Sequence, residues 1–208
     1  MDNCAAYMDW IAETYDVQPV IVAMEALDEI SCKELIARMK NPAILISCND
    51  FVGIQIGAVL RELSLLTTTR YHAMVLSMPG RVPFIGLSRD ERIMGVMKEI
   101  KEYDNYYVDY RTENLAEVLK EKASRILGAA DEVARYAAVI KKHLPYYYAQ
   151  MGMLGLDIRN LVKEKFPLFE LNDIDENKVE NLVPYIPPEF VAASRRKYKQ
   201  LKKLEEKS

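Results

Sequence analysis

The chain has 208 residues, of which half are apolar and 28 % are charged, and its formal net charge is -3. This length suits one large domain or one domain with an appendage, and the charge is too small to indicate a nucleic-acid partner. No apolar run approaches the roughly 18 to 20 residues of a membrane span, and the acidic opening "MDNCAAYMDW" is unlike a secretory signal. We therefore expect a cytoplasmic protein without a transmembrane segment.

The first part of the chain alternates between strand and helix patterns. Short apolar runs rich in β-branched residues predict buried strands, and amphipathic or capped segments predict the helices between them. The expected helices are 5–15, 31–40, 51–63, 71–78 and 91–102, and the expected strands are 19–24, 43–47, 64–68, 82–88 and 106–110. An alternation about every 20 residues implies βαβ crossovers and an α/β fold with a doubly wound, mostly parallel Rossmann-like sheet.

The pattern changes after residue 112, where long helical segments replace the alternation. Residues 115–127 carry one apolar stripe, residues 129–144 form a second helix that continues after Pro145, and residues 166–190 are an irregular connector. The last 20 residues hold seven Lys or Arg and three Glu, which predicts a basic C-terminal helix over 194–207. We expect two domains: a Rossmann-like domain over 1–127 and a helical extension over 128–208.

The three cysteines do not have the spacing of a metal site. Cys4, Cys32 and Cys48 form neither a CxxC pair nor a Cys/His ligand set. Such scattered cysteines are typical of small core residues in a reducing compartment. We expect neither a metal nor a cofactor.

Polar residues gather in the loops after the third and fourth expected strands, "TTTRYH" and "GLSRDER". Ligands of open parallel sheets bind beyond the carboxyl ends of the strands, and neighbouring strands bring such loops together. Both loops also lead into helices, whose first N–H groups favour a phosphate or a carboxylate. The residues involved are Thr68, Thr69, Arg70, His72, Ser88, Arg89, Asp90 and Arg92.

Three of these residues have chemistry suited to an anionic substrate. Arg70 is a planar, two-pronged donor, His72 can deliver a proton near neutral pH, and Arg92 adds a second positive charge. A structural interpretation also stands. A single histidine in an apolar helix is more often structural, and Arg89 to Arg92 can be a solvated helix start with local ion pairs.

The stretch "TTTRYHAMVLSMPGRVPFIGLSRDERIMGVM", residues 67–97, resembles the signature of the polysaccharide pyruvyl transferases. In that family an Arg-His-Ala run, with one aromatic or aliphatic residue between Arg and His, opens a helix and is followed by a strand that ends in Leu-Ser. The resemblance extends over roughly residues 10–127. The family's next loop has an aromatic-Asp-x-Lys pattern, whereas this chain has Arg89-Asp90-Glu91-Arg92, so one charge is kept and the aromatic residue is lost.

The resemblance implies a fold and a reaction. Family members are similar to two-domain GT-B glycosyltransferases, and this chain resembles their C-terminal half alone. They transfer a pyruvyl group from phosphoenolpyruvate to a sugar of a cell-surface polysaccharide. The resemblance implies that His72 is the proton donor and that Arg70 binds the carboxylate or phosphate. It implies further donor-binding roles for Thr69, Ser88, Arg89 and Arg92. The implied partners are phosphoenolpyruvate, a glycan acceptor, and a second Rossmann-like half or a second copy.

Two other functions remain open. A GT-B nucleotide-sugar glycosyltransferase half has the same kind of sheet, with an acidic residue for the ribose and basic residues for the diphosphate. A non-catalytic interaction module is the other, in which residues 129–161 and the basic C-terminal helix bind a partner, because aromatic and Met residues are enriched at interfaces.

Overall fold

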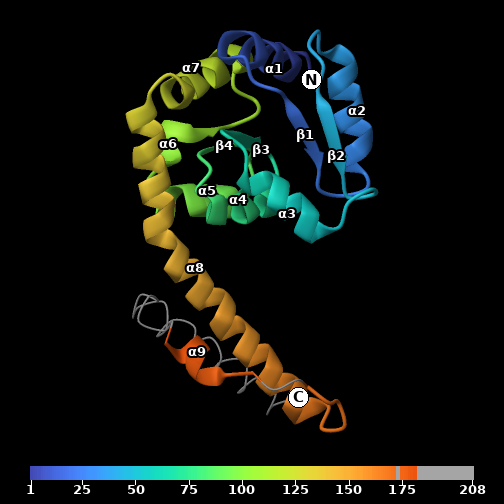
Figure 1. Cartoon of the computed structure of the whole chain (residues 1–208), viewed down its shortest axis with the longest axis vertical. Helices are drawn as coiled ribbons and strands as arrows, with labels where there is room; N and C mark the ends of the chain where they lie inside the picture. The colour runs from blue at the N-terminus through green and yellow to red at the C-terminus, as the bar shows by residue number, and fades with distance from the viewer. Residues whose placement is uncertain (172–173, 182–208) are drawn as a thin grey trace. The chain divides into compact units, whose positions relative to one another are not determined.

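The computed structural model describes residues 1–171 and 174–181, and contacts divide the chain into two compact units, 1–142 and 143–208 (Figure 1). Each unit is described by itself. The predicted basic helix over 194–207 lies outside the described residues. The predicted domain boundary after residue 127 falls between two helices and stays a prediction, whereas the two compact units divide after Lys142.

The order of the elements follows the predicted alternation. The strands are β1 (Val20–Ala23), β2 (Ile44–Ser47), β3 (Leu66–Thr68), β4 (Phe84–Leu87) and β5 (Tyr107–Val108). The helices are α1 (Asp2–Tyr15), α2 (Asp28–Arg38), α3 (Gly53–Arg61), α4 (Tyr71–Ser77), the 3-10 turn η1 (Met78–Gly80), α5 (Glu91–Glu99), α6 (Tyr103–Tyr106), α7 (Leu115–Leu127), α8 (Ala130–Lys165) and α9 (Glu176–Glu180).

All five strands are parallel to their neighbours, but they form two sheets. β1 pairs with β2 in the register Val20 to Ile44, and β3, β4 and β5 form the second sheet in that order. The prediction of a mixed α/β fold with parallel strands is confirmed. A single continuous sheet is not observed, because no ladder joins β1 to β3 within the described part of the chain.

Helices lie on both sides of the strands in the first unit. Figure 1 shows α1 and α7 together above the strands and α3, α4 and α5 below them. Residues of β4 are buried along its whole length, as expected of a parallel strand covered on both faces. The core is therefore centred on the β3–β5 sheet, and the β1–β2 sheet lies beside it.

The first residue of α5 agrees with the predicted helix, whereas the first residue of α2 does not. Asp90 caps α5, where its side chain accepts a hydrogen bond from the Arg92 N–H group, and the apolar stripe of that helix is buried. Helix α2 begins at Asp28, three residues before the start of the predicted helix over 31–40. The Asp28 side chain accepts a hydrogen bond from the Glu25 N–H group, so the turn is organised ahead of Ser31.

An ion pair with a buried carboxylate attaches the beginning of α8 to the rest of the first unit. Arg135 donates hydrogen bonds of 2.6 and 3.0 Å to the two oxygens of Glu102, whose side chain is almost fully buried. Arg135 also bonds Glu132 and lowers the pKa of that carboxyl group to about 2. The neighbouring Tyr136 donates a 2.8 Å hydrogen bond to the backbone oxygen of Phe84, at the start of β4. These contacts fix the first turns of α8 on the first unit.

Helix α8 continues through Pro145 into the second unit, as the sequence predicted. Pro145 lacks an N–H group, so one backbone hydrogen bond of the helix is lost there. No helix in the described ranges is both long enough and apolar enough to cross a membrane.

Candidate functional site

The segments that follow β1, β3 and β4 meet at one edge of the first unit. Arg70, directly before α4, forms ion pairs with Glu25 and Asp28, which lie between β1 and the first turn of α2. The Arg92 guanidinium, in the first turn of α5, lies 5.2 Å from the centre of the Tyr71 ring. The loops after the third and fourth strands therefore converge, and a third segment, after the first strand, joins them.

Arg70 is engaged by carboxylates. Its Nε donates a 3.0 Å hydrogen bond to one oxygen of Asp28, its Nη2 contacts the other oxygen, and its Nη1 lies 3.2 Å from Glu25. Asp28 raises the pKa of the Arg70 guanidinium by holding its charged form. Arg70 thus shows the two-pronged geometry that was expected for binding an anionic substrate, but the carboxylate it binds is that of Asp28.

The other two candidate arginines are also paired. Arg92 Nη2 lies 2.6 Å from Asp90, and this contact lowers the pKa of the Asp90 carboxyl group. Arg89 Nε lies 3.3 Å from Asp109, beyond β5. All three arginines are therefore neutralised locally, and the edge is a mixed ionic surface rather than a purely positive one.

The candidate hydroxyl groups have structural partners. Ser88 is buried, and its Oγ accepts a 2.9 Å hydrogen bond from the Asp90 N–H group. Thr68 makes the corresponding bond with the N–H group of Arg70. These two turns hold the loops in shape. Thr69 is exposed at the same edge.

His72 is exposed near the start of α4. Its ring lies edge-on to the Tyr71 ring, with centroids 5.6 Å apart. A histidine satisfied within an apolar core does not describe this residue, because His72 is exposed.

Sequence reasoning missed Glu25 and Asp28. The signal was the acidic stretch "EALDE", which follows the first strand directly. The carboxyl ends of all parallel strands in a unit lie at the same edge, so the loop after β1 should have been considered with the other two.

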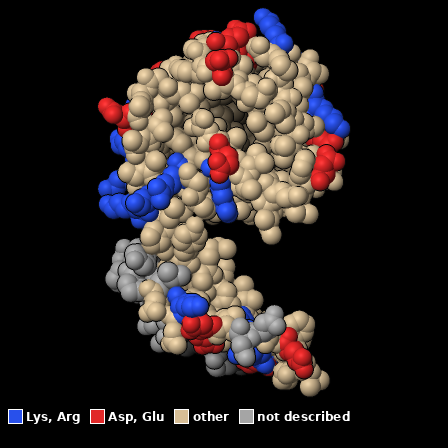
Figure 2. Space-filling model, in the orientation of Figure 1, with Lys and Arg blue, Asp and Glu red and all other residues tan. Residues whose placement is uncertain are grey.

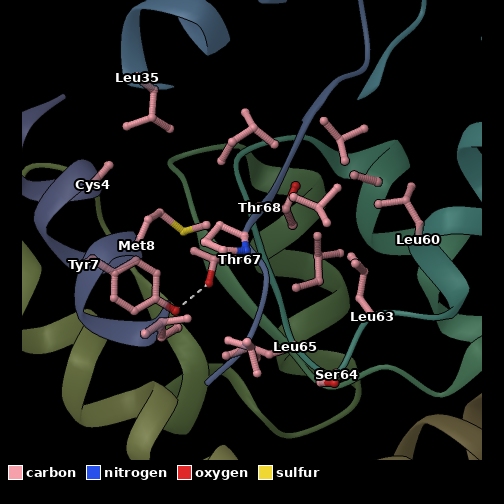
Figure 3. Close-up of a pocket in the computed structure, with 18 of the residues that line it drawn as sticks. Cys4, Tyr7, Met8, Leu35, Leu60, Leu63, Ser64, Leu65, Thr67 and Thr68 are labelled. Carbon is pink, nitrogen blue, oxygen red and sulfur yellow. Dashed lines mark hydrogen bonds between the residues drawn. The ribbon is translucent and has the colours of Figure 1, made fainter. Parts of the chain in front are cut away.

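A cavity of about 300 Å³ lies between the two sheets and reaches this edge. Figure 2 shows a hollow in this face of the unit, with acidic and basic side chains close to its rim. The lining is mostly apolar, and Figure 3 shows side chains from α1, including Tyr7 and Met8, facing Leu60 of α3 and the threonines of β3. Tyr7 and Thr67 share a 2.9 Å hydrogen bond at the cavity wall.

The site was compared with known proteins and searched for metal-binding side chains. No protein family, no curated protein and no solved structure matches the chain. Among the described residues, no group of three or more His, Cys, Asp or Glu side chains is arranged to hold a metal ion.

Proposed function

We propose that the first unit is a pyruvyl-transferase-like domain that binds phosphoenolpyruvate at the edge where the loops of Arg70 and Arg92 meet, with His72 as the proton donor. The observation that carries this proposal is the 5.2 Å approach of the Arg92 guanidinium to Tyr71, which joins the two loops of the family-like signature. An exposed histidine two residues after a two-pronged arginine is suited to an acid-catalysed reaction of a small anion.

The proposal includes a Rossmann-like unit. The parallel strands run in the order β2-β1 and then β3-β4-β5, with helices on both sides (Figure 1). That order is compatible with the two arms of a doubly wound sheet, which diverge from a switch point between β1 and β3. A ligand would then sit at the switch point, where the cavity and the ionic edge meet.

The proposed reaction needs one proton donor and cationic contacts. His72 in its protonated form gives a proton to the methylene carbon of phosphoenolpyruvate, which leaves an oxocarbenium-like centre at the neighbouring carbon. A sugar hydroxyl adds to that centre and gives up its proton. Phosphate then leaves, and a second hydroxyl adds to close the ketal. One hydroxyl proton restores His72, which gave its own proton to the new methyl group, and the other hydroxyl proton leaves with phosphate.

Binding of the donor requires an exchange of partners at Arg70. Asp28 and Glu25 hold Arg70 before the substrate arrives, and a carboxylate or phosphate must replace at least one of them. The ion pair is 41 % exposed on the arginine side, so solvent weakens it and the exchange is feasible.

Turnover requires that the open side of the reacting centre is covered. We assign this role to a partner half or to a second copy of the chain. Five large apolar side chains are exposed in the segments that follow β1 and β2, namely Leu27, Ile30, Phe51, Val52 and Ile54. Exposed apolar groups beside a candidate site favour an interaction surface. Covering them would also remove water from the reacting centre.

Calorimetric titration with phosphoenolpyruvate tests the proposal. Arg70→Ala should weaken binding roughly 10- to 100-fold, because a charge-assisted pair of hydrogen bonds is lost. Arg38→Ala is the matched control, since Arg38 also bonds two carboxylates, Asp2 and Glu34, on the opposite end of α2. An unchanged affinity in Arg70→Ala, or no binding by the wild type, would remove the proposal.

A nucleotide-sugar donor is the second candidate, and the acidic pair Glu25 and Asp28 favours it. Carboxylates at a switch point are suited to the ribose hydroxyls, and the nearby arginines to a diphosphate. A thermal-shift screen separates the two: stabilisation by UDP- or GDP-sugars with no response to phosphoenolpyruvate would select this alternative.

A further inference from the structure

The facing edges of β1 and β3 carry backbone groups that no neighbouring strand satisfies. Ala23 accepts a hydrogen bond on the β2 side through its C=O group, so the N–H and C=O groups of Val22 point to the opposite edge of β1. Leu66 donates on the β4 side through its N–H group, so the groups of Thr67 point to the opposite edge of β3. In the described ranges, no strand ladder covers either edge.

These two edges border the cavity of about 300 Å³. Val22 and Thr67 both line it, and both are half-buried, whereas the residues on either side of each in its strand are buried. Backbone N–H and C=O groups that are taken out of water need hydrogen-bonding partners. A purely apolar ligand would leave the two edges unsatisfied, so the cavity favours a molecule with hydrogen-bonding groups on its rim.

The two other sides of the cavity are apolar. Tyr7 and Met8 of α1 line one of them, and Leu60 of α3 and Ala73 of α4 line the other (Figure 3). Helix α1 lies on the opposite side of the strands from α3 and α4 (Figure 1). A flat molecule in the layer of the strands would therefore have apolar contacts on both faces. The Met8 thioether is also suited to an aromatic ring, since contacts between sulfur and aromatic rings are favourable.

The size and the charge of the cavity narrow the choice of ligand. Its volume is about twice that of a cavity of roughly 150 Å³, which holds one benzene molecule, so two fused rings fit. Among the described lining residues, Arg70 is the only one with a charged side chain, and Glu25 and Asp28 already neutralise it. An ion placed deeper in the cavity would be buried without a partner, so a neutral ligand is favoured.

We propose that the cavity between β1 and β3 is a binding site for a neutral heteroaromatic molecule of two fused rings, such as an indole or a purine base. The ring faces pack between α1 and the side chains of α3 and α4, and the rim forms hydrogen bonds with the backbone of Val22, Thr67 or both. Apolar walls with a few fixed polar groups are the usual composition of a small-molecule pocket. The site lies in the layer of the strands, whereas phosphoenolpyruvate is proposed to bind at the ionic edge.

Titration with indole, followed by the amide NMR signals of the isotope-labelled protein, tests the site. Indole is neutral and flat, and it carries one N–H donor on its rim. The signals of Val22 and Thr67 should shift saturably, with a dissociation constant of about 1 mM or lower. The matched control is N-methylindole, which lacks the donor and should bind about tenfold more weakly, since one hydrogen bond is lost.

Two cysteine variants locate the binding. Cys4 and Cys48 are both half-buried, but Cys4 lines this cavity and Cys48 lines a separate hollow. Cys4→Phe should weaken indole binding by roughly tenfold or more, because the phenyl ring and the ligand compete for the same volume. Cys48→Phe should leave the affinity unchanged. If Cys4→Phe does not fold, the comparison of the two probes on the wild type decides by itself.

Three results would each overturn the proposal: no saturable shift at Val22 or Thr67 with indole, equal affinity for N-methylindole, or unchanged binding by a folded Cys4→Phe variant. None of these measurements uses phosphoenolpyruvate, so they are independent of the proposed function.

Discussion

Arg70 is held by two carboxylates that lie 42 and 45 residues earlier in the chain. The guanidinium is therefore pre-oriented at the edge of the first unit, but it is not free. An anionic substrate benefits from the fixed orientation of the guanidinium, but it binds less tightly because it has to displace an internal carboxylate. A substitution of the competing carboxylate can therefore change substrate affinity while Arg70 itself is kept.

Asp28→Asn should strengthen phosphoenolpyruvate binding about three- to tenfold, because the amide keeps the shape of the carboxylate but removes its charge from Arg70. Calorimetric titration measures the change. The same substitution in an Arg70→Ala background should have no effect, since the competition needs both partners. An equal gain in both backgrounds would show that Asp28 acts on the ligand by another route.

Asp9 is a buried carboxylate with a structural role. It accepts hydrogen bonds of 2.8 to 3.0 Å from the N–H groups of Lys40 and Asn41, and thereby ties α1 to the end of α2. Burial acts to raise the pKa of Asp9, but the N–H groups of Asn41 and Lys40 outweigh it and lower that pKa. Its contribution to stability is therefore present above the unfolded pKa, about 4, and is lost as the pH falls.

Asp9→Asn should reduce the free energy of unfolding at pH 7 by about 2 kcal/mol, because an amide cannot accept all of these bonds and one N–H donor would face another. Urea denaturation at pH 7 and at pH 3 measures the difference, which should shrink at the lower pH. A loss of the same size at both pH values would mean that the carboxylate charge is not involved.

At the scale of elements, close backbone contact between η1 and the end of α3 depends on Gly80. A Cβ atom at this position would lie 2.2 Å from the backbone oxygen of Arg61, which is too close for any side chain. The turn that leads into β4 is therefore packed directly against α3.

Gly80→Ala should lower the free energy of unfolding by about 3 kcal/mol, because the backbone has to move to admit the methyl group. Gly95→Ala is the control. Gly95 lies within α5, and a methyl group there would enter open space, so alanine should be neutral or stabilising by up to about 1 kcal/mol. Thermal unfolding of both variants separates the two cases, and similar melting temperatures would refute the close-contact explanation.

At the scale of the whole molecule, stability should be unevenly distributed within the first unit. Helix α2 has no fully buried residue, whereas α5 buries Ile93, Val96 and Met97 against the β3–β5 sheet. Few buried apolar contacts mean that a segment opens at a low free energy.

Amide hydrogens of α2 should therefore exchange faster than those of α5, through local opening rather than global unfolding. Native-state exchange at increasing denaturant measures this: α2 should show no dependence on low denaturant, while α5 should follow the global transition. Equal protection of the two helices would show that the β1–β2 sheet is as firmly held as the second sheet.

The positions of the elements follow from local patterns. "AILIS" and "VPFIGLS" are apolar runs, and β2 and β4 lie within them. The predicted helix over 91–102 corresponds to α5, since Asp90 caps its first turn. These features depend on residues a few positions apart, so a periodicity or a cap is enough to predict them. The five strands were predictable for this reason, and their parallel direction was predictable from the alternation of strands and helices.

The partners of the site residues and the division of the sheet depend on distant contacts. Local patterns identified Arg70 and His72 but could not reveal that Asp28 neutralises Arg70, because that ion pair forms only when the segments after β1 and β3 are brought together. They also could not reveal that β1 and β3 face each other across a cavity. Sequence by itself determined where strands and helices form, through local hydrophobic periodicity and capping. Only the tertiary structure decided which strand edges pair and which charges meet, because both depend on packing between residues far apart in the chain.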